Sequence, residues 1–542
     1  MKKVPVSPDI ILFNGKVATQ NPGQPYAEAL AVAQGRILAV GNSVEILALA
    51  GAESEMVDLA GRLAVPGFID SHFHFYEWAL KRKGVKLDDV SGLDELIARV
   101  SSASEAEPAG QWIMGQGWNE TDWPEQRMPT RQLLDQAVPD HPLLLWRCDL
   151  HLAVANSAAL ALAGIDAGTP DPPEGRIERD GSGEPNGILR EMAINLARRA
   201  VVPPPLEQIM AAFEDATTAL HRLGITGIHD IRLMADEDGA DAFRAFQELD
   251  CQGHLAMRLW VSLPGQRLDE IIGLGLRTGF GNDHLRVGHV KYFTDGGMGA
   301  RSAWMIDPYL DAEHGMSLMD MATLAREISK AESAGLAVMV HAIGDRANRE
   351  VIDIFTALEA ARVRSGSGLP AFAHRIEHVQ VIRPEDVARL RNLHLALNMT
   401  PSNLPLDIKL IDTTMAEKGR YAYAIRPLLD TGTPVMFSSD CPVCDPNPLL
   451  GIHAAVTRQR PNGTPLGGWH AENRITVAEA LQAYTSTPAA VHNAVDQGVI
   501  AAGKLADIAI LSEDILTLPP SLIPQVYVEM TLFDGQIVYR NF

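Results

Sequence analysis

Six side chains that can bind or tune a cation lie near the ends of five apolar segments. The clearest case is the segment VPGFIDSHFHF at 65–75, which contains His72 and His74 near its end. In a strand, alternate side chains face the same side, so the two imidazoles project together. Neutral imidazole is a common ligand of divalent metal ions. The segment therefore predicts a metal site at the end of a buried strand.

Four further residues stand at corresponding positions near the ends of other apolar runs: Lys291, His341, His378 and Asp440. A single histidine at a strand end is usually structural. Six residues with matching placement on five strands are hard to assign to packing, and we interpret them as one metal centre.

Lys291 leaves several interpretations open. An ammonium group has only donors, so it cannot ligate a cation. The amine would be either deprotonated or modified by CO₂ to a carbamate, whose two anionic oxygens could bridge two ions. The alternative is a lysine that binds substrate or pairs with an acid.

The segments that position these residues alternate with helical patterns. Apolar, strand-like runs recur along the chain, and stretches such as 321–334 and 384–393 between them have helical periodicity. Eight strands alternating with helices predict a TIM-like (β/α)₈ barrel of the α/β class, which carries its chemistry at the C-terminal ends of the strands. The eight runs are 64–72, 224–230, 255–263, 285–293, 335–341, 371–378, 393–399 and 433–440.

The chain ends and one long insertion do not fit the barrel pattern. Residues 1–63 and 497–542 contain short strand-like runs with hairpin turns, which predict one small β-sandwich domain built from both termini. The barrel domain then spans 64–496. It contains an insertion at about 76–215, after the first barrel strand, which we interpret as a lid and substrate wall.

Composition limits the function classes. The 542 residues are 46% hydrophobic and 21% charged, as in ordinary soluble globular proteins. The net charge of -22 argues against nucleic acid as a partner. No stretch reaches the ~18 apolar residues of a membrane helix, and the N-terminus lacks the apolar run of a signal peptide. With only four cysteines, we expect a cytoplasmic protein.

Several motifs together resemble the metal-dependent amidohydrolase superfamily, in its YtcJ-like branch, which includes N-substituted formamide deformylases. They are VPGFIDSHFH, HVKYFTDGGMGARSA, VMVHAIGDRAN, RIEHVQ, SSDCPV and AAGKLADIAIL, and the match runs from about residue 9 to residue 541. The resemblance implies a (β/α)₈ barrel with a β-sandwich from both chain ends, in agreement with the pattern above. Two positions depart from the family: Cys441, where an aromatic residue is usual, and Gly297, where serine is common.

The resemblance also implies a ligand set. One ion would be held by His72, His74 and Asp440, and a second by His341 and His378. A carboxylated Lys291 would bridge them. The implied cofactor is Zn²⁺, one or two ions per chain, with other divalent metals as alternatives.

The function that follows is cleavage of a C–N bond in an amide, such as an N-substituted formamide, by attack of a metal-bound hydroxide. Asp440 is the candidate catalytic residue, which would take the proton of the water and pass it to the leaving amine. An ester or carbamate hydrolase or an isomerase would use the same site, and a non-catalytic scaffold protein is the remote alternative. The expected partner is a small-molecule substrate, and the resemblance allows a homodimer.

Two residues outside the ligand set are candidates for substrate binding. His151 lies within the insertion, in RCDLHLAVANS, which resembles a motif of the family, and Arg301 follows the fourth barrel strand. The alternatives are a solvent-facing loop histidine and an outward salt bridge. We expect no ligand role for His229 or His374, and we interpret the CxxC at 441–444 as an ordinary loop.

Overall fold

The computed structural model describes residues 7–82, 84–173, 175–232, 240–366 and 368–542. At its centre lies an eight-stranded sheet whose strands follow one another in sequence order, with every neighbouring pair parallel. Each strand overlaps one of the eight predicted runs, so the barrel prediction is confirmed. The strands are β8 (Phe68–Phe73), β15 (Ile225–Asp230), β16 (Arg258–Pro264), β17 (Leu285–Phe293), β18 (Val338–Ala342), β19 (His374–His378), β20 (Leu395–Met399) and β21 (Val435–Phe437).

The sheet closes on itself between β8 and β21, its first and last strands. Phe73 and Cys441 form a parallel bridge. The amide of Asp440 donates to the carbonyl of His72 at 2.9 Å, and the amide of His74 donates to the carbonyl of Cys441 at 2.8 Å. The closure therefore brings three of the predicted ligands to one place, although they lie far apart in the sequence.

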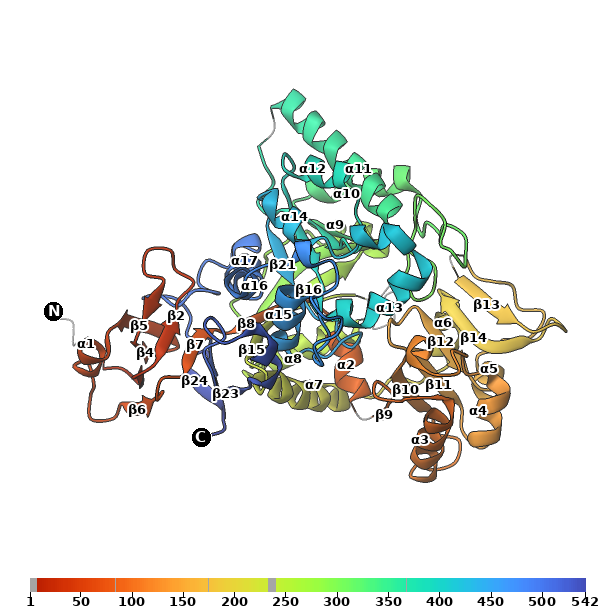
Figure 1. Cartoon of the computed structure of the whole chain (residues 1–542), viewed down its shortest axis with the longest axis horizontal. Helices are drawn as coiled ribbons and strands as arrows, with labels where there is room; N and C mark the ends of the chain where they lie inside the picture. Colours follow the sequence, from red (N-terminus) through yellow and green to blue (C-terminus); the bar gives the residue numbers. More distant parts are fainter. Residues whose placement is uncertain (1–6, 83, 174, 233–239, 367) are drawn as a thin grey trace.

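Helices between the strands surround the central sheet (Figure 1). α10 (Met321–Ser333) illustrates why: its buried residues Leu324, Ile328 and Ala331 recur at helical spacing and form one apolar face. Asp320 caps this helix by accepting an amide hydrogen from the first turn. Other helices that follow or precede barrel strands are α2 (Phe75–Lys81), α7 (Leu206–His221), α8 (Asp241–Cys251), α9 (Leu268–Gly273), α11 (Asp345–Ser365), α12 (Pro384–Leu390), α13 (Leu404–Thr414), α14 (Ile425–Asp430), α15 (Pro448–Thr457), α16 (Val477–Ala483) and α17 (Ser486–Val491).

The chain ends form two further sheets, which lie together beside the barrel (Figure 1); one contains N-terminal strands alone and the other combines strands of both ends. Leu12 and Val32 from the N-terminal part pack in one buried cluster with Ile508 and Leu532 from the C-terminal part. The predicted β unit from both termini is therefore confirmed, while its exact limits stay a prediction. One sheet has the order β5 (Arg36–Gly41), β4 (Ala29–Ala33), β1 (Ile10–Phe13), β6 (Glu55–Asp58); the other has β24 (Gln536–Arg540), β23 (Val528–Phe533), β22 (Ile508–Leu511), β7 (Leu63–Pro66), β2 (Lys16–Ala18), β3 (Tyr26–Ala27).

The insertion after β8 forms a sheet of its own with separate buried cores. Trp118 and Trp123 are almost fully buried in one of these cores, where their indole nitrogens donate to the carbonyls of Leu145 and Val90. The sheet has the order β13 (Gly175–Arg179), β14 (Pro185–Glu191), β12 (Leu152–Ala155), β11 (Leu143–Arg147), β10 (Ile113–Trp118), β9 (Val85–Lys86), and its helices are α3 (Leu93–Glu105), α4 (Arg131–Ala137), α5 (Ser157–Leu162) and α6 (Ile194–Arg198).

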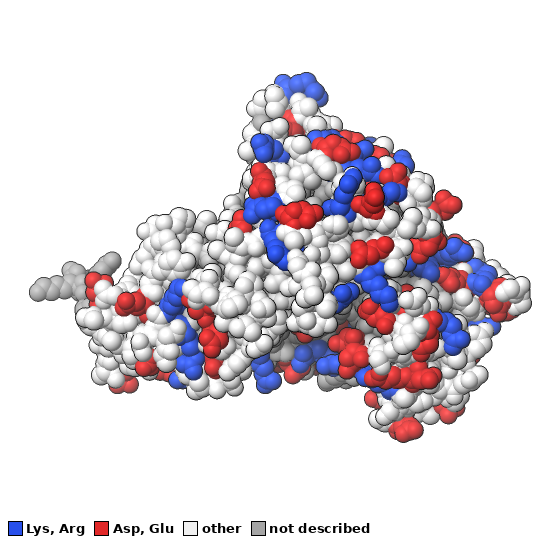
Figure 2. Space-filling view, in the orientation of Figure 1, with Lys and Arg blue, Asp and Glu red and all other residues white. Residues whose placement is uncertain are grey.

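The surface carries both signs of charge. Figure 2 shows acidic and basic side chains interspersed over the face in view. Among the helices of the described residues, none has both the length and the apolar composition to cross a membrane.

Candidate metal centre

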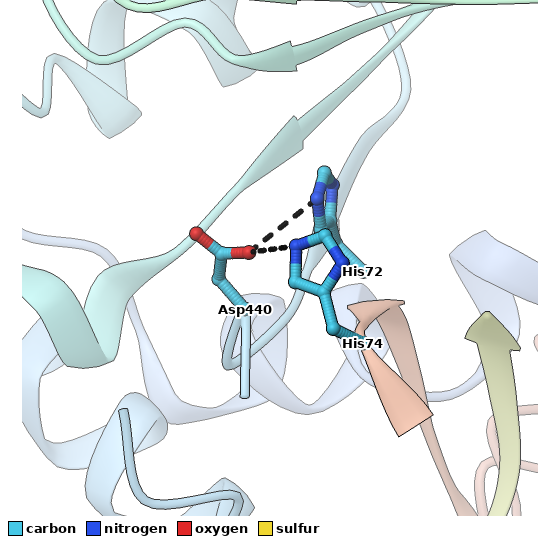
Figure 3. Close-up of side chains that lie close together, drawn as sticks. All are labelled: His72, His74 and Asp440. Carbon is cyan, nitrogen blue, oxygen red and sulfur yellow. Dashed lines mark ion pairs between the residues drawn. The ribbon is translucent and has the colours of Figure 1, made fainter. Parts of the chain in front are cut away.

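Three of the predicted ligands meet at the rim of the barrel (Figure 3). Oδ1 of Asp440 lies 3.4 Å from Nε2 of His72 and 3.3 Å from Nε2 of His74. Each residue offers one ligand atom, and these atoms all lie within 4.8 Å of one another. All three side chains are buried. Two imidazole nitrogens and a carboxylate oxygen at this spacing are a donor set that suits a divalent metal ion.

The second predicted pair of ligands borders this group. The ring centroids of His72 and His378 are 4.8 Å apart, and those of His341 and His378 are 4.5 Å apart. Nδ1 of His378 lies 3.9 Å from Oδ2 of Asp440. The carboxylate of Asp440 therefore faces two histidines with one oxygen and a third with the other.

The surroundings of the histidines favour the protonation state and the tautomer that bind a metal ion. Burial, reinforced by neighbouring positive charges, lowers the pKa of His72 and of His341 well below the usual range, and burial does the same for His378. The imidazoles are therefore neutral, which is the form that binds a metal. Nδ1 of His72 lies 2.6 Å from Oε2 of Glu377, and Nδ1 of His74 lies 2.9 Å from the carbonyl oxygen of Ile231. Because carbonyl and carboxylate oxygens accept hydrogen, both Nε2 atoms keep their lone pairs.

Lys291 lies in the barrel interior, almost fully buried. Within the described structure its Nζ has no hydrogen-bond partner, and the same holds for Nε2 of His341 and Oδ1 of Asp440. Burial lowers the pKa of Lys291 to about 8, so the neutral amine that can react with CO₂ forms more readily than in an exposed lysine. Buried polar atoms without partners are rare in folded proteins. A cation with a carboxylated lysine would supply partners to all three, so these residues fit a metal.

The insertion brings His151 to the same pocket as His72 and His74. The centroid of its ring lies 5.7 Å from that of His341. Nδ1 of His151 lies 2.8 Å from Oε2 of Glu191, whose other oxygen accepts a hydrogen bond from the hydroxyl of Ser302. Burial, the largest single effect, lowers the pKa of His151, but the charge and hydrogen bond of Glu191 together with the charges of Asp149 and Asp440 raise it to about 9. His151 therefore lies beside the candidate ligands, and its role at the substrate stays a prediction.

The barrel side of this contact is a glycine-rich loop at 296–299, after β17. Gly297 lies against His151: a Cβ at this position would be 2.8 Å from Cδ2 of the imidazole and 3.1 Å from Cγ. The absence of a side chain therefore lets the histidine of the insertion approach the barrel. Gly297, where the related family commonly has serine, therefore leaves room for the ring of His151.

Arg301, the second predicted substrate contact, lies outside the described lining of the pocket. Its Nη2 lies 2.9 Å from Oδ2 of Asp311, and its Nη1 donates to the carbonyls of Met298 and Gly299. The guanidinium is thus held by the loop that it belongs to. This arrangement corresponds to the alternative of a salt bridge rather than to substrate binding.

The histidines to which no ligand role was given have other partners. His374, at the opposite end of β19 from His378, pairs with Glu332 at 2.9 Å. Nδ1 of His229 accepts a hydrogen bond from Arg375 at 2.9 Å. Both imidazoles therefore have partners outside the candidate ligand set.

Three acidic residues near the centre escaped the sequence analysis. Glu377 directly precedes His378 in RIEH, but its contact with His72 spans 305 positions. Asp295 follows β17, and its Oδ1 lies 3.6 Å from Nε2 of His341; burial raises the pKa of Asp295 to about 7. Glu191 lies at the end of β14 without a sequence signal. The spacing of RIEH alone could have placed Glu377 on the same strand as a ligand, but not its partner.

A closed barrel of parallel strands with histidines, a lysine and an aspartate at its C-terminal rim defines the class of metal-dependent hydrolases. Within that class the chain belongs to the Amidohydrolase family, whose sequence model matches residues 55–539. This confirms the resemblance found in the sequence.

Individual relatives match over almost the whole chain. The chain is 31% identical to the putative amidohydrolase YtcJ of Bacillus subtilis (strain 168), over 98% of this chain and 99% of that protein. It is 29% identical to the N-substituted formamide deformylase of Arthrobacter pascens, over 98% of each. The structure of an uncharacterized metal-dependent hydrolase from Pyrococcus horikoshii OT3 is similar with a TM-score of 0.75, 28% identity, and coverage of 94% of this chain and 99% of that one.

Proposed function

We propose that the protein hydrolyses the C–N bond of a small amide, of the N-substituted formamide type, with one or two zinc ions at the rim of the barrel. The observation that carries the proposal is the buried group of His72, His74 and Asp440, whose ligand atoms all lie within 4.8 Å of one another. Histidine and carboxylate donors in a buried site favour zinc among the common divalent ions.

The proposed ligands are those predicted from the sequence, namely His72, His74, His341, His378, Asp440 and, as a carbamate, Lys291. A divalent ion at this position would acidify water and polarise a carbonyl group. The carboxylate of Asp440 would accept the proton of the water and deliver it to the leaving nitrogen, because an amine is expelled only after protonation. We propose that His151, fixed by Glu191 at 2.8 Å, contacts the substrate.

The lining of the pocket supports an amide with an apolar substituent. Trp146 and Met192 of the insertion line the pocket together with Phe293 at the end of β17, Leu406 of α13 and Val443. The same lining holds charged side chains such as Lys81, Arg147 and Asp149, and apolar surface beside polar groups is typical of sites for small organic ligands. The deformylase relative, by its name, acts on N-substituted formamides, and an apolar N-substituent would fit these walls.

The alternative enzyme activities would use the same site residues, whereas a non-catalytic scaffold protein would use none of them. Ester or carbamate hydrolysis needs the same ion and the same carboxylate, and differs only in the leaving group. A non-catalytic scaffold would have no use for an ion. The small-molecule substrate, the homodimer and the cytoplasmic location remain parts of the proposal.

The test is to purify the wild-type chain, measure bound metal, and screen N-substituted formamides, N-acyl amines and esters for product release before and after chelation. We expect about one to two zinc ions per chain and activity that chelator removes and zinc restores. The variant His74→Gln should lose metal and activity. His254→Gln is the matched control because His254 has a side chain that is 59% exposed and lies outside the pocket. A folded chain that binds no metal would contradict the proposal, and activity on esters alone would favour the alternative.

A further inference from the structure

A charged pair lies inside the barrel next to the proposed ligands. Arg375 and Glu377 face the same side of β19, and both side chains have zero exposure. Nε of Arg375 donates to Oε1 of Glu377 at 2.8 Å, and Nη2 donates to Oε2 at 3.0 Å. This two-point contact occupies both carboxylate oxygens and balances the buried charge.

Oε2 of Glu377 also reaches Nδ1 of His72, at 2.6 Å. β8 and β19 are not neighbours in the sheet, so the contact crosses the interior of the barrel. A carboxylate locked by an arginine is an acceptor only, and Nδ1 of His72 must therefore carry hydrogen. Nε2 of His72 then keeps its lone pair, and it is this atom that lies 3.4 Å from Oδ1 of Asp440.

The guanidinium of Arg375 has three further partners, the carbonyl of Ser71 and the rings of His229 and His492. Its Nη2 donates to the carbonyl of Ser71 at 2.6 Å, and its Nη1 faces Nδ1 of His229 at 2.9 Å. Nη1 also lies 3.4 Å from Nε2 of His492, whose Nδ1 lies 3.0 Å from the carbonyl of Pro488. An arginine has no acceptor, so both histidines present unprotonated nitrogens to it.

We propose that Glu377 is a positioning residue of the metal centre: held by Arg375, it fixes the tautomer and the ring orientation of His72 so that Nε2 is presented to the ion. The proposal rests on the proposed function, since it requires an ion at His72. Glu377 is not itself a ligand, because its two oxygens are directed to Arg375 and His72. Carboxylates that orient a ligating histidine contribute about 10–100-fold to metal affinity.

The chain contains a second group of a histidine, a glutamate and an arginine, which serves as a control for His72, Glu377 and Arg375. At the other end of β19, His374 pairs with Glu332 at 2.9 Å, and Arg362 pairs with the same carboxylate at 2.8 Å. The chemistry is the same, a histidine, a glutamate and an arginine. Glu332 lies outside the pocket and does not touch a proposed ligand in the described structure.

The experiment compares the affinity for zinc of the wild-type chain, Glu377→Gln, Glu377→Asp and Glu332→Gln by competition with a chromophoric chelator. We expect zinc to bind roughly 10–100-fold more weakly to both Glu377 variants and with unchanged affinity to Glu332→Gln. Thermal unfolding of the metal-free proteins is measured alongside. A merely structural role would lower the Tm of the metal-free form without changing the affinity.

Glu377→Asp keeps the negative charge for Arg375 and withdraws the carboxylate from His72, so it carries the test if Glu377→Gln does not fold. Wild-type affinity in Glu377→Asp, or an equal loss in Glu332→Gln, would overturn the positioning role. If the wild-type chain binds no zinc, the proposed function fails instead, and the two failures are thereby distinguished.

Discussion

Replacing Gly297 by alanine would test the role of His151 without removing any polar group. An added Cβ would lie 2.8 Å from Cδ2 of His151 and 3.1 Å from its Cγ. Non-bonded carbon atoms prefer about 3.5–4.0 Å, so the imidazole must move by roughly 1 Å. A displacement of about 1 Å in a positioned group reduces rate by around 100-fold. We therefore expect Gly297→Ala to lower kcat/KM about 100-fold while zinc content stays unchanged.

The assay is steady-state hydrolysis of the amide that the screen identifies, with zinc-loaded protein. Gly273→Ala is the matched control, because a Cβ at Gly273 meets no atom within 4 Å. If Gly297 acts through His151, the double variant with His151→Gln should be no slower than His151→Gln alone. Wild-type turnover in Gly297→Ala, or fully additive losses in the double variant, would refute the reasoning.

The remaining predictions concern the proton, the ion pair and the contact between barrel and terminal sheets. Asp440→Asn should keep some metal but lower kcat by about 10²–10⁴-fold, and turnover measured at equal zinc content like that of the wild type would exclude Asp440 as the proton shuttle. The pKa of His151 is raised from 6.5 to about 9, so its ion pair with Glu191 stabilises the fold fully below pH 6.5 and no longer above about pH 9. Glu191→Gln should accordingly lower the Tm at pH 6 and have no such effect at pH 10, and a loss that is independent of pH would contradict this. Buried Arg258 lies 2.7 Å from Asp507, whose side chain is 9% exposed. Arg258→Ala should lower the free energy of unfolding by about 3–5 kcal/mol, measured by denaturant titration; a change below about 1 kcal/mol would show that the pair contributes no more than an exposed surface salt bridge.

The sequence was sufficient to predict the barrel and the residues at its rim. Each barrel strand is a short apolar run between turns and helices, and strand periodicity places His72 and His74 on one side. Parallel strands expose their C-terminal ends at one rim, so strand-end residues such as His341 and Asp440 must gather there. These rules depend only on local pattern and on topology, which is why they could be applied without coordinates.

The contacts that hold the ligands could not be predicted in the same way. Glu377 reaches His72 across the interior of the barrel, and Glu191 contacts both His151, 40 positions away, and Ser302, 111 positions away. Such pairs depend on side-chain reach and on the docking of the insertion, for which the sequence contains no periodic signal. Arg301 is the opposite case, a residue that the sequence placed at the pocket and that lies elsewhere. The loop after its strand turns the side chain toward Asp311.

The energetic cost of the centre argues for an ion rather than for a scaffold. The ammonium or amine of Lys291 is buried, and its Nζ has no hydrogen-bond partner in the described structure. Leaving one buried donor unsatisfied costs about 1–3 kcal/mol, and Oδ1 of Asp440 adds a second such group. A protein that only held its shape would be more stable with apolar side chains at both positions. An ion bound together with a carboxylated Lys291 would give both groups a partner, so binding zinc should raise the Tm by an amount that grows with free zinc concentration.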